Sequence, residues 1–317
     1  MTDKLRVGII GIGNMGYQYG LDDKRSQPAS HYHGYMFHKD QCDVVAVCDI
    51  LPEAVGRIKD AYMEVEKNRV TFTQKYQDYK LMLENEKLDI ISIVTPDITH
   101  EQIGKDCILA RPKVILWEKP FCLDLKQGGE LIKLAQACNV KIAVNHQRRS
   151  DQIWNTLPAV FADKGFGELV RAVAKCYGDG LRQWVHMADL VNMFEIKDKC
   201  IFVPLQNVNY VLFEMEFYFK EHAVRVVDNG RGIIEMTATP SQYYGINYKN
   251  LIKELKCSTF SSNELVVTMR DVIANVLNCA RIPGLQPNCT AQHGLEAVRL
   301  CREWIDQYGI KEAIPNA

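Results

Sequence analysis

The chain has 317 residues, which is enough for two domains that each bury a core of their own. Apolar residues make up 47% of it and charged residues 24%, and the formal net charge is −1. This balanced charge argues against nucleic acid or an anionic membrane as a partner, and no apolar run approaches the length that spans a bilayer. The eleven cysteines are scattered without CxxC pairs, so we expect reduced thiols in a cytoplasmic protein and no metal site.

Short apolar runs rich in Val and Ile alternate with helical stretches in the first half of the chain. Five of these runs are candidate buried strands: 5–10, 44–47, 89–94, 113–117 and 141–144. Stretches with helical spacing, such as 52–62 and 123–137, lie between them. Alternating strands and helices predict right-handed crossovers and a doubly wound parallel sheet of the Rossmann type. Ligands bind such sheets beyond the carboxyl ends of the strands, where the motifs described below fall.

The pattern changes after about residue 150. Four segments there alternate between apolar and polar residues or run apolar: 169–177, 208–220, 222–229 and 232–239. They predict an α+β domain with an open, mostly antiparallel sheet that has one exposed face. Two helical stretches follow, 265–279 and 294–308. We therefore predict a dinucleotide-binding domain at 1–147 and a substrate and oligomerisation domain at 148–317, with the helix 294–308 packing back on the first domain.

A glycine turn, Gly11-Ile12-Gly13-Asn14-Met15-Gly16, directly follows the first candidate strand. In a dinucleotide site Gly11 would permit the tight turn, Gly13 would let the backbone approach the pyrophosphate, and Gly16 would let helix pack on strand. The helix amino terminus would then offer N–H groups to the phosphates. A lone motif of this kind is about as often a structural turn as a cofactor site. The strand before it and the helix expected after it favour the cofactor site.

The acid that binds the ribose hydroxyls usually follows such a turn by about 20 residues, whereas Asp49 lies almost twice as far away. Segment 22–33 is polar and has no helical period, so we predict a loop inserted after the first turn of helix, either idle or in a subunit contact. Asp49 ends the second strand, although it could instead cap the next helix. Ile50 and Leu51 offer no positive charge to a 2′-phosphate, which favours NAD over NADP.

The tripeptide Glu118-Lys119-Pro120 places a lysine at the ligand edge of the sheet, followed by a proline that we expect to be cis. Taken alone, it could be a surface turn that happens to contain a lysine. It stands, however, in an ordered series with the glycine turn, Asp49, Val94-Thr95-Pro96, His100, Asn145-His146-Gln147-Arg148-Arg149 and His186. This series resembles the Gfo/Idh/MocA family, which includes glucose–fructose oxidoreductase and inositol dehydrogenase. The resemblance covers nearly the whole chain and is weaker beyond residue 150.

The resemblance implies a Rossmann domain followed by an open, mostly antiparallel sheet, and a homodimer or homotetramer. It implies a tightly held NAD(P) and hydride transfer to or from a hydroxyl or ketone of a sugar, cyclitol or sugar nucleotide. By position, Lys119 and His186 would be the catalytic acid/base residues, and Arg149 would face the substrate. The cofactor would be contacted by Gly11, Gly13, Asn14, Met15, Gly16, Asp49, Thr95, Pro96, His100, Glu118, Lys119 and Pro120.

The chemistry fits these roles, because hydride transfer from a carbinol requires a group that takes the hydroxyl proton. A lysine beside a positive nicotinamide would have its pKa lowered toward use, and a histidine acts near neutrality without tuning. The alternative for His186 is a core histidine, since it lies among apolar residues of a helix.

One departure from the family concerns the position four residues before His186, where many members have an aspartate and this chain has Arg182. Gln183 could supply the missing polar group. Arginines near the site, Arg149 and Arg182, would suit an anionic substrate, although loop arginines are usually only solvated. We therefore predict an NAD-dependent oxidoreductase acting on a small carbohydrate-type substrate. The alternative is a dinucleotide-binding regulator or scaffold of the same fold that has lost turnover.

Overall fold

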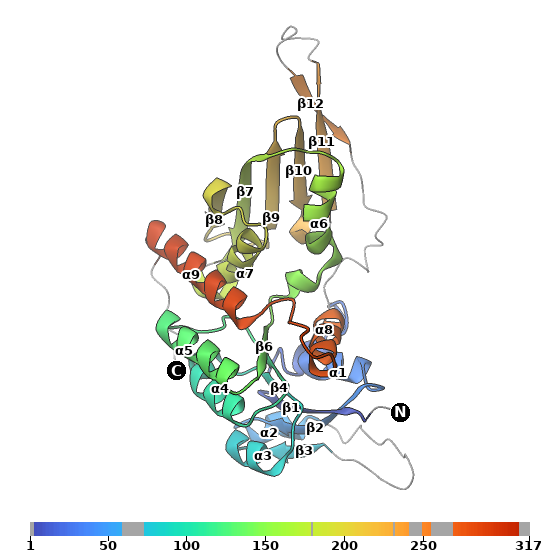
Figure 1. Ribbon diagram of the computed structural model, residues 1–317, viewed down its shortest axis with the longest axis vertical. Coiled ribbons are helices and arrows are strands. Elements are labelled where there is room, and N and C mark those ends of the chain that lie inside the picture. Colours follow the sequence, from blue (N-terminus) through green and yellow to red (C-terminus); the bar gives the residue numbers. More distant parts are fainter. Residues whose placement is uncertain are drawn as a thin grey trace. The chain divides into compact units, whose positions relative to one another are not determined.

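The computed structural model describes residues 3–58, 73–178, 180–230, 232–240, 249–254 and 269–310. The chain divides into two compact units (Figure 1). The first comprises Met1–Ser150 and Val267–Leu295, and the second comprises Asp151–Val266 and Glu296–Ala317. Each unit contains a sheet that has six strands within the described residues.

All neighbouring strands of the first sheet pair in parallel. Its strands are β1 (Leu5–Ile10), β2 (Cys42–Cys48), β3 (Gln74–Tyr76), β4 (Ile90–Ile93), β5 (Val114–Trp117) and β6 (Lys141–Val144). Their order is β3-β2-β1-β4-β5-β6, which is the order of the dinucleotide-binding Rossmann fold. The predicted Rossmann sheet is therefore confirmed. The three-residue strand β3 was not predicted, because it is too short to show an apolar pattern.

Helices cover both faces of this sheet. They are α1 (His31–Phe37), α2 (Pro52–Gly56), α3 (Tyr79–Asn85), α4 (His100–Leu109), α5 (Leu125–Ala137) and α8 (Met269–Arg281). Helices α1 and α8 pack together over one face, and α4 and α5 lie side by side over the other (Figure 1). Of the predicted helix 52–62, the last residues lie outside the described part of the chain, as do residues 265–268 of the predicted helix 265–279.

Helix α8 corrects the predicted domain boundary, which assigned everything after residue 147 to the second domain. The apolar stripe of α8, formed by Val272, Ile273, Val276 and Leu277, is buried in the core of the first unit. Helix α1 has only seven residues, so α8 supplies apolar cover on the same sheet face. This long-range pairing leaves no local signal in the sequence.

The second sheet has the order β12-β11-β10-β9-β7-β8 and is antiparallel except between β7 and β8. Its strands are β7 (Leu169–Tyr177), β8 (Cys200–Leu205), β9 (Phe213–Phe219), β10 (His222–Val227), β11 (Gly232–Pro240) and β12 (Lys249–Glu254). The mostly antiparallel α+β domain is confirmed. Strands β8 and β12 were not predicted. In the turn between β10 and β11, Asn229 and Gly230 adopt left-handed φ values of 57° and 95°, and Arg231 lies outside the described residues.

Aromatic side chains attach helices to one face of the second sheet. The ring centroid of Phe161 in α6 (Gln152–Asp163) lies 5.2 Å from that of Phe217 in β9. The ring centroid of Trp184 in α7 (Gly180–Met193) lies 5.1 Å from that of Phe202 in β8. Trp304 stacks on the same ring, with the two centroids 3.9 Å apart. Trp304 belongs to α9 (Ala291–Gln307), which was expected to pack on the first domain. Only its first turn groups with the first unit, and residues from 296 onward group with the second.

Candidate functional site

The three glycines of the turn after β1 occupy different environments. Gly11 has a φ of +97°, and a Cβ there would lie 2.5 Å from the carbonyl oxygen of Val94. A Cβ on Gly16 would lie 2.1 Å from the carbonyl oxygen of Gly11. At Gly13, in contrast, a Cβ would meet no described atom within 4 Å. Gly11 and Gly16 are therefore required by the fold, and Gly13 leaves the backbone open to a ligand.

The first helical turn after the glycines is interrupted by an insertion. The backbone N–H of Tyr17 donates to the carbonyl oxygen of Gly13 at 2.9 Å, but the chain then leaves the helix and rejoins it at residue 31. There the backbone N–H of His31 donates to the carbonyl oxygen of Met15 at 2.9 Å, and that of Tyr32 donates to the carbonyl oxygen of Gly16 at 3.0 Å. These are the hydrogen bonds that an uninterrupted helix would make. The predicted inserted loop is thus confirmed, but it occupies residues 18–30, including a short 3-10 helix at Gln18–Leu21, rather than 22–33.

Asp49, at the end of β2, is held against the glycine turn. Its Oδ2 accepts the N–H of Ile12 at 2.8 Å, and its Oδ1 accepts the N–H of Leu51 at 3.0 Å. The residue at the N-cap of α2 is Leu51, and that cap has no side-chain hydrogen bond, so the helix-cap alternative for Asp49 is wrong. Each carboxylate oxygen has a second lone pair. Asp49 can therefore still accept hydrogen bonds from ribose hydroxyls.

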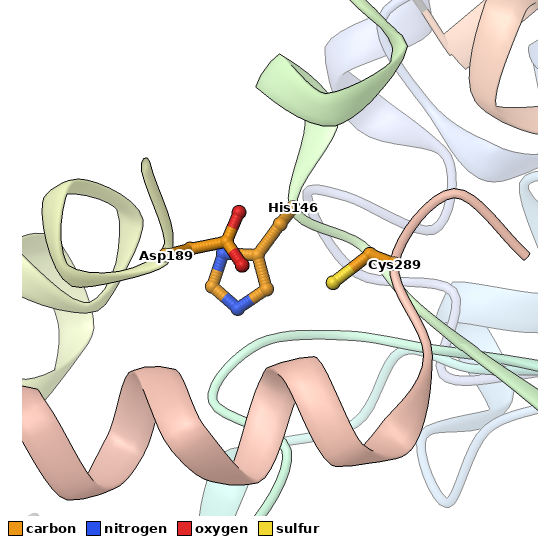
Figure 2. Close-up of side chains that lie close together, drawn as sticks. All are labelled: His146, Asp189 and Cys289. Atoms are coloured by element: carbon orange, nitrogen blue, oxygen red, sulfur yellow. The ribbon is translucent and has the colours of Figure 1, made fainter. Parts of the chain in front are cut away.

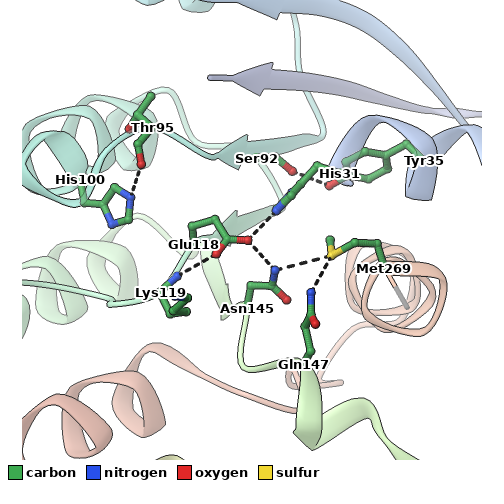
Figure 3. A network of polar contacts seen from close by, with 10 residues as sticks. All are labelled: His31, Tyr35, Ser92, Thr95, His100, Glu118, Lys119, Asn145, Gln147 and Met269. Carbon is green, nitrogen blue, oxygen red and sulfur yellow. Dashed lines mark hydrogen bonds and ion pairs between the residues drawn. The ribbon is translucent and has the colours of Figure 1, made fainter. Parts of the chain in front are cut away.

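The turn after β5 contains the predicted lysine, and the peptide bond Lys119–Pro120 is cis, as expected. Lys119 is half-buried. Glu118 is 6% exposed, and its carboxylate lies at the centre of the network in Figure 3. Its Oε1 accepts from His31 Nε2 at 2.9 Å and from Asn145 Nδ2 at 2.5 Å, while the N–H of Lys119 donates to Oε2 at 3.3 Å.

These contacts decide the ionisation of Glu118. Burial raises the pKa of this carboxyl, but it is outweighed by the hydrogen bond and charge of His31, the hydrogen bond of Asn145 and the charge of Lys119. The net result is a pKa below the usual range for glutamate. At neutral pH the turn therefore contains a buried carboxylate immediately before Lys119.

His100 lies behind the turns rather than at an open edge. It is buried, with Nδ1 3.0 Å from the carbonyl oxygen of Pro120 and Nε2 2.9 Å from that of Thr95 (Figure 3). Burial lowers the pKa of His100 despite these two carbonyl oxygens. Because both ring nitrogens face the backbone, His100 joins the turn after β4 to the turn after β5. We infer that it positions Thr95 and Pro120 for a ligand instead of lining the cofactor itself.

Asn145, His146 and Arg149 of the segment after β6 are buried within the first unit. Asn145 and Arg149 line a cavity of about 10 Å³ together with His146 and Cys289, which is about the space that one water needs. Arg149 is only 8% exposed, and its contact with a substrate stays a prediction from the family resemblance.

His146 and Cys289 approach each other on the wall of this cavity (Figure 2). The nearest ligand-type atoms of their side chains, a ring nitrogen and Sγ, lie within 4.8 Å of each other, and both residues are buried. Neither Cys289 nor any other cysteine of the described residues is in a disulfide. Asp189, also labelled in Figure 2, is a buried residue of α7 in the second unit.

Helix α7 carries the three predicted site residues of the second unit. Arg182 is exposed, Gln183 is half-buried against Gly178, and His186 is half-buried. The neighbours Val185 and Met187 are fully buried, so His186 differs from the apolar core around it. This weakens the alternative that His186 is a core histidine. Arg182 and His186 are four residues apart, which places them on the same face of the helix.

The histidine that reaches Glu118 was missed in the sequence. His31 follows the inserted loop, so its distance from the glycine turn matches no common spacing. Its place becomes clear only from the fold, because residue 31 begins the stretch of helix that completes the interrupted first turn.

The strand order, the glycine turn and the acid at the end of β2 define the first unit as a dinucleotide-binding Rossmann domain. Residues 5–146 match the family model for the oxidoreductase family with an NAD-binding Rossmann fold, Gfo/Idh/MocA. The resemblance noted in the sequence is therefore confirmed over these residues of the first unit. Within the part of the chain that the structure describes, no helix is long and apolar enough to cross a membrane.

The uncharacterized oxidoreductase YdgJ of Escherichia coli (strain K12) is 28% identical over 169 residues, which are 53% of this chain and 42% of that protein. The inositol 2-dehydrogenase of Arthrobacter sp. (strain FB24) is 29% identical over 172 residues, or 54% and 44% of the two chains. These matches thus span less than half the length of the relatives.

The WlbA dehydrogenase of Bordetella pertussis, solved in complex with NADH and UDP-GlcNAcA, shares the fold. Its TM-score is 0.70 at 15% identity, covering 99% of this chain and 100% of that one.

Proposed function

We propose that this protein is an NAD-dependent oxidoreductase that transfers a hydride to or from a hydroxyl or ketone carbon of a sugar, cyclitol or sugar nucleotide. The observation that carries the proposal is the turn after β5. Lys119 stands there at the ligand edge of a Rossmann sheet, and its N–H is hydrogen-bonded to the buried carboxylate of Glu118. Ligands of such sheets bind at this edge.

The residues of the first unit fit a dinucleotide. Gly13 leaves open space where a pyrophosphate would approach, and Asp49 keeps acceptor capacity for ribose hydroxyls. The residues that would hold the cofactor are Gly11, Gly13, Asn14, Met15, Gly16, Asp49, Thr95, Pro96, Glu118, Lys119 and Pro120. Ile50, which is 81% exposed, and Leu51 stand beside Asp49. An acid followed by exposed apolar residues favours NAD over NADP, because a 2′-phosphate would meet the like charge of Asp49 while Ile50 and Leu51 offer it no positive charge.

Lys119 would take the proton of the substrate hydroxyl as the carbonyl forms, and it would return that proton in the reverse reaction. The bound nicotinamide would supply the hydride acceptor or donor. His186 would be the second acid/base residue, and its half-buried position leaves part of the ring accessible. Arg182 and Gln183 would contact the substrate from α7, and an exposed arginine suits an anionic group such as a carboxylate or phosphate.

A second candidate is a dinucleotide-binding regulator without turnover. The observation in its favour is that Arg182 takes the place of the aspartate found in many family members. One experiment distinguishes the two. The purified protein is loaded with NADH, mixed with the oxidised forms of inositol or of UDP-GlcNAcA, and followed by the absorbance of NADH in a single turnover. Hydride transfer to either compound supports the oxidoreductase, while tight NADH binding without transfer across a wider panel of keto-sugars supports the regulator.

We further propose that copies of the chain associate through the second sheet. Helices α6, α7 and α9 cover the face that contains Phe202 and Phe217. Ile201, on the opposite face, is 48% exposed, and that face also carries the ion pair between Lys175 and Glu216 at 2.5 Å. Light scattering of the wild type and of Ile201→Arg tests this proposal, which expects a dimer or tetramer that the substitution dissociates.

A further inference from the structure

We propose that His31 is a positioning residue that joins the phosphate-binding glycine turn to the lysine turn. The inference rests on the proposed function, since it assigns His31 a part in orienting Lys119 for proton transfer. His31 would touch neither cofactor nor substrate. It would act through Glu118, which precedes the lysine.

His31 is connected by hydrogen bonds to both turns. The backbone N–H of His31 donates to the carbonyl oxygen of Met15 in the glycine turn at 2.9 Å. The ring Nε2 of the same residue lies 2.9 Å from Oε1 of Glu118 (Figure 3). One residue is therefore hydrogen-bonded to both motifs, which are separated by about a hundred residues of sequence.

The contact between His31 and Glu118 is buried. His31 is 0% exposed, Glu118 is 6% exposed and Asn145 is 2% exposed. A carboxylate in such surroundings requires donors, and charge-assisted hydrogen bonds are strong where water is excluded. Because a carboxylate only accepts, Nε2 of His31 is the donor. The other ring nitrogen, Nδ1, has no hydrogen-bond partner among the described residues, so the polar contact of this ring is made to Glu118.

The second oxygen of the Glu118 carboxylate contacts the backbone of Lys119. Oε2 of Glu118 accepts the N–H of Lys119 at 3.3 Å, so the carboxylate fixes the backbone from which the lysine side chain extends. Without the donor at His31, the buried carboxylate would be left under-satisfied and would move or take up a proton. A shift of about 1 Å in a reacting group costs on the order of a hundredfold in rate.

The test uses the whole chain and a pair of substitutions at one position. His31→Leu removes the donor, and His31→Gln keeps an N–H donor near the position of Nε2. The matched control is His38→Leu, at the C-terminal end of the same helix α1, where the ring contacts the carbonyl oxygen of Arg270 at 2.9 Å. Three quantities are measured: hydrogen exchange of the Lys119 amide by NMR, the dissociation constant for NADH, and the single-turnover rate of hydride transfer.

We expect His31→Leu to speed exchange at Lys119 by about tenfold or more, as for loss of a hydrogen bond to a charged group. The transfer rate should fall by a similar factor, with a change of less than about threefold in NADH affinity. His31→Gln should restore both, and His38→Leu should change neither. Unchanged exchange at Lys119 in His31→Leu would overturn the inference, as would equal effects of the control.

The exchange measurement needs no substrate, so it decides the role of His31 even if the chain proves to be a regulator. Failure of the proposed function would show as absent hydride transfer in the wild type. If His31→Leu does not fold, Glu118→Leu breaks the same link from the other side, because it removes both oxygens that accept from His31 and Lys119. It must then speed exchange at Lys119, and unchanged exchange in that variant would also overturn the inference.

Discussion

Asp49 accepts the backbone N–H of Ile12 at 2.8 Å, so the acid that ends β2 is fixed to the turn that follows β1. The residue predicted to select the cofactor's ribose thus also stabilises the loop predicted to hold its phosphates. Substitution at Asp49 should therefore change both the choice of cofactor and its overall affinity.

The first prediction follows from that contact. Wild type should bind NADH more tightly than NADPH. Asp49→Ala should reduce this difference in affinity and weaken the binding of both cofactors. Asp49→Asn is the matched control, because it keeps an oxygen that can accept from Ile12 but removes the charge. Asp49→Asn should also reduce the difference between NADH and NADPH affinity, but it should lose less NADH affinity than Asp49→Ala does. Calorimetry showing that wild type binds NADPH as well as NADH would contradict the assignment of NAD.

The glycine turn provides a second prediction with an internal control. Gly13→Ala should fold normally, because its Cβ meets no described atom within 4 Å, but it should weaken NADH binding by about tenfold or more because the methyl group occupies the approach of the pyrophosphate. Gly16→Ala should lower the free energy of unfolding, since its Cβ would lie 2.1 Å from the carbonyl oxygen of Gly11. Urea denaturation and NADH fluorescence titration measure the two effects. Equal NADH affinity in Gly13→Ala and wild type would place the cofactor elsewhere.

A third prediction concerns pH. The pKa of Glu118 lies below its usual range in the folded state, so its contribution to stability is present above the unfolded pKa of about 4.3 and is lost as the pH falls through the folded value. Glu118→Gln should therefore be less stable than wild type at pH 7, and this difference in the free energy of unfolding should shrink below about pH 4. Urea titrations at several pH values measure it. A difference that does not change between pH 7 and pH 3 would show that Glu118 is not ionised in the fold.

The fourth prediction concerns α7. His186→Ala should slow hydride transfer less than Lys119→Ala does, because water can replace a half-buried acid/base group. Arg182→Asp, which introduces the residue common in the family, should not raise the rate if Gln183 already fills the orienting role. His222→Ala is a control in the same unit, where the histidine stacks on Phe166 at 4.4 Å. A large gain of activity in Arg182→Asp would instead favour the reading of this chain as a member that has lost turnover.

Much of the first unit could be predicted because its signals are local. Apolar runs mark the strands, the glycines mark the turn, and the polar segment before His31 marks an insertion. The core position of α8 could not be predicted, since its apolar stripe is equally compatible with either domain. The roles of His31 and His100 depend on contacts with Glu118, Thr95 and Pro120 that only the fold creates. The burial of Arg149 likewise follows from packing.

The measurement that tests the central claim most directly is the single-turnover rate of hydride transfer in Lys119→Ala, followed by the absorbance of NADH. The control is Lys113→Ala, near the opposite end of β5, where the exposed lysine pairs with Asp89 at 2.9 Å. Lys119→Ala should slow transfer by about a hundredfold or more, with a much smaller loss of NADH affinity, because the glycine turn and Asp49 hold the cofactor. Lys113→Ala should match wild type. A Lys119→Ala variant that transfers hydride at the wild-type rate would contradict the account, because the lysine would then have no part in the chemistry.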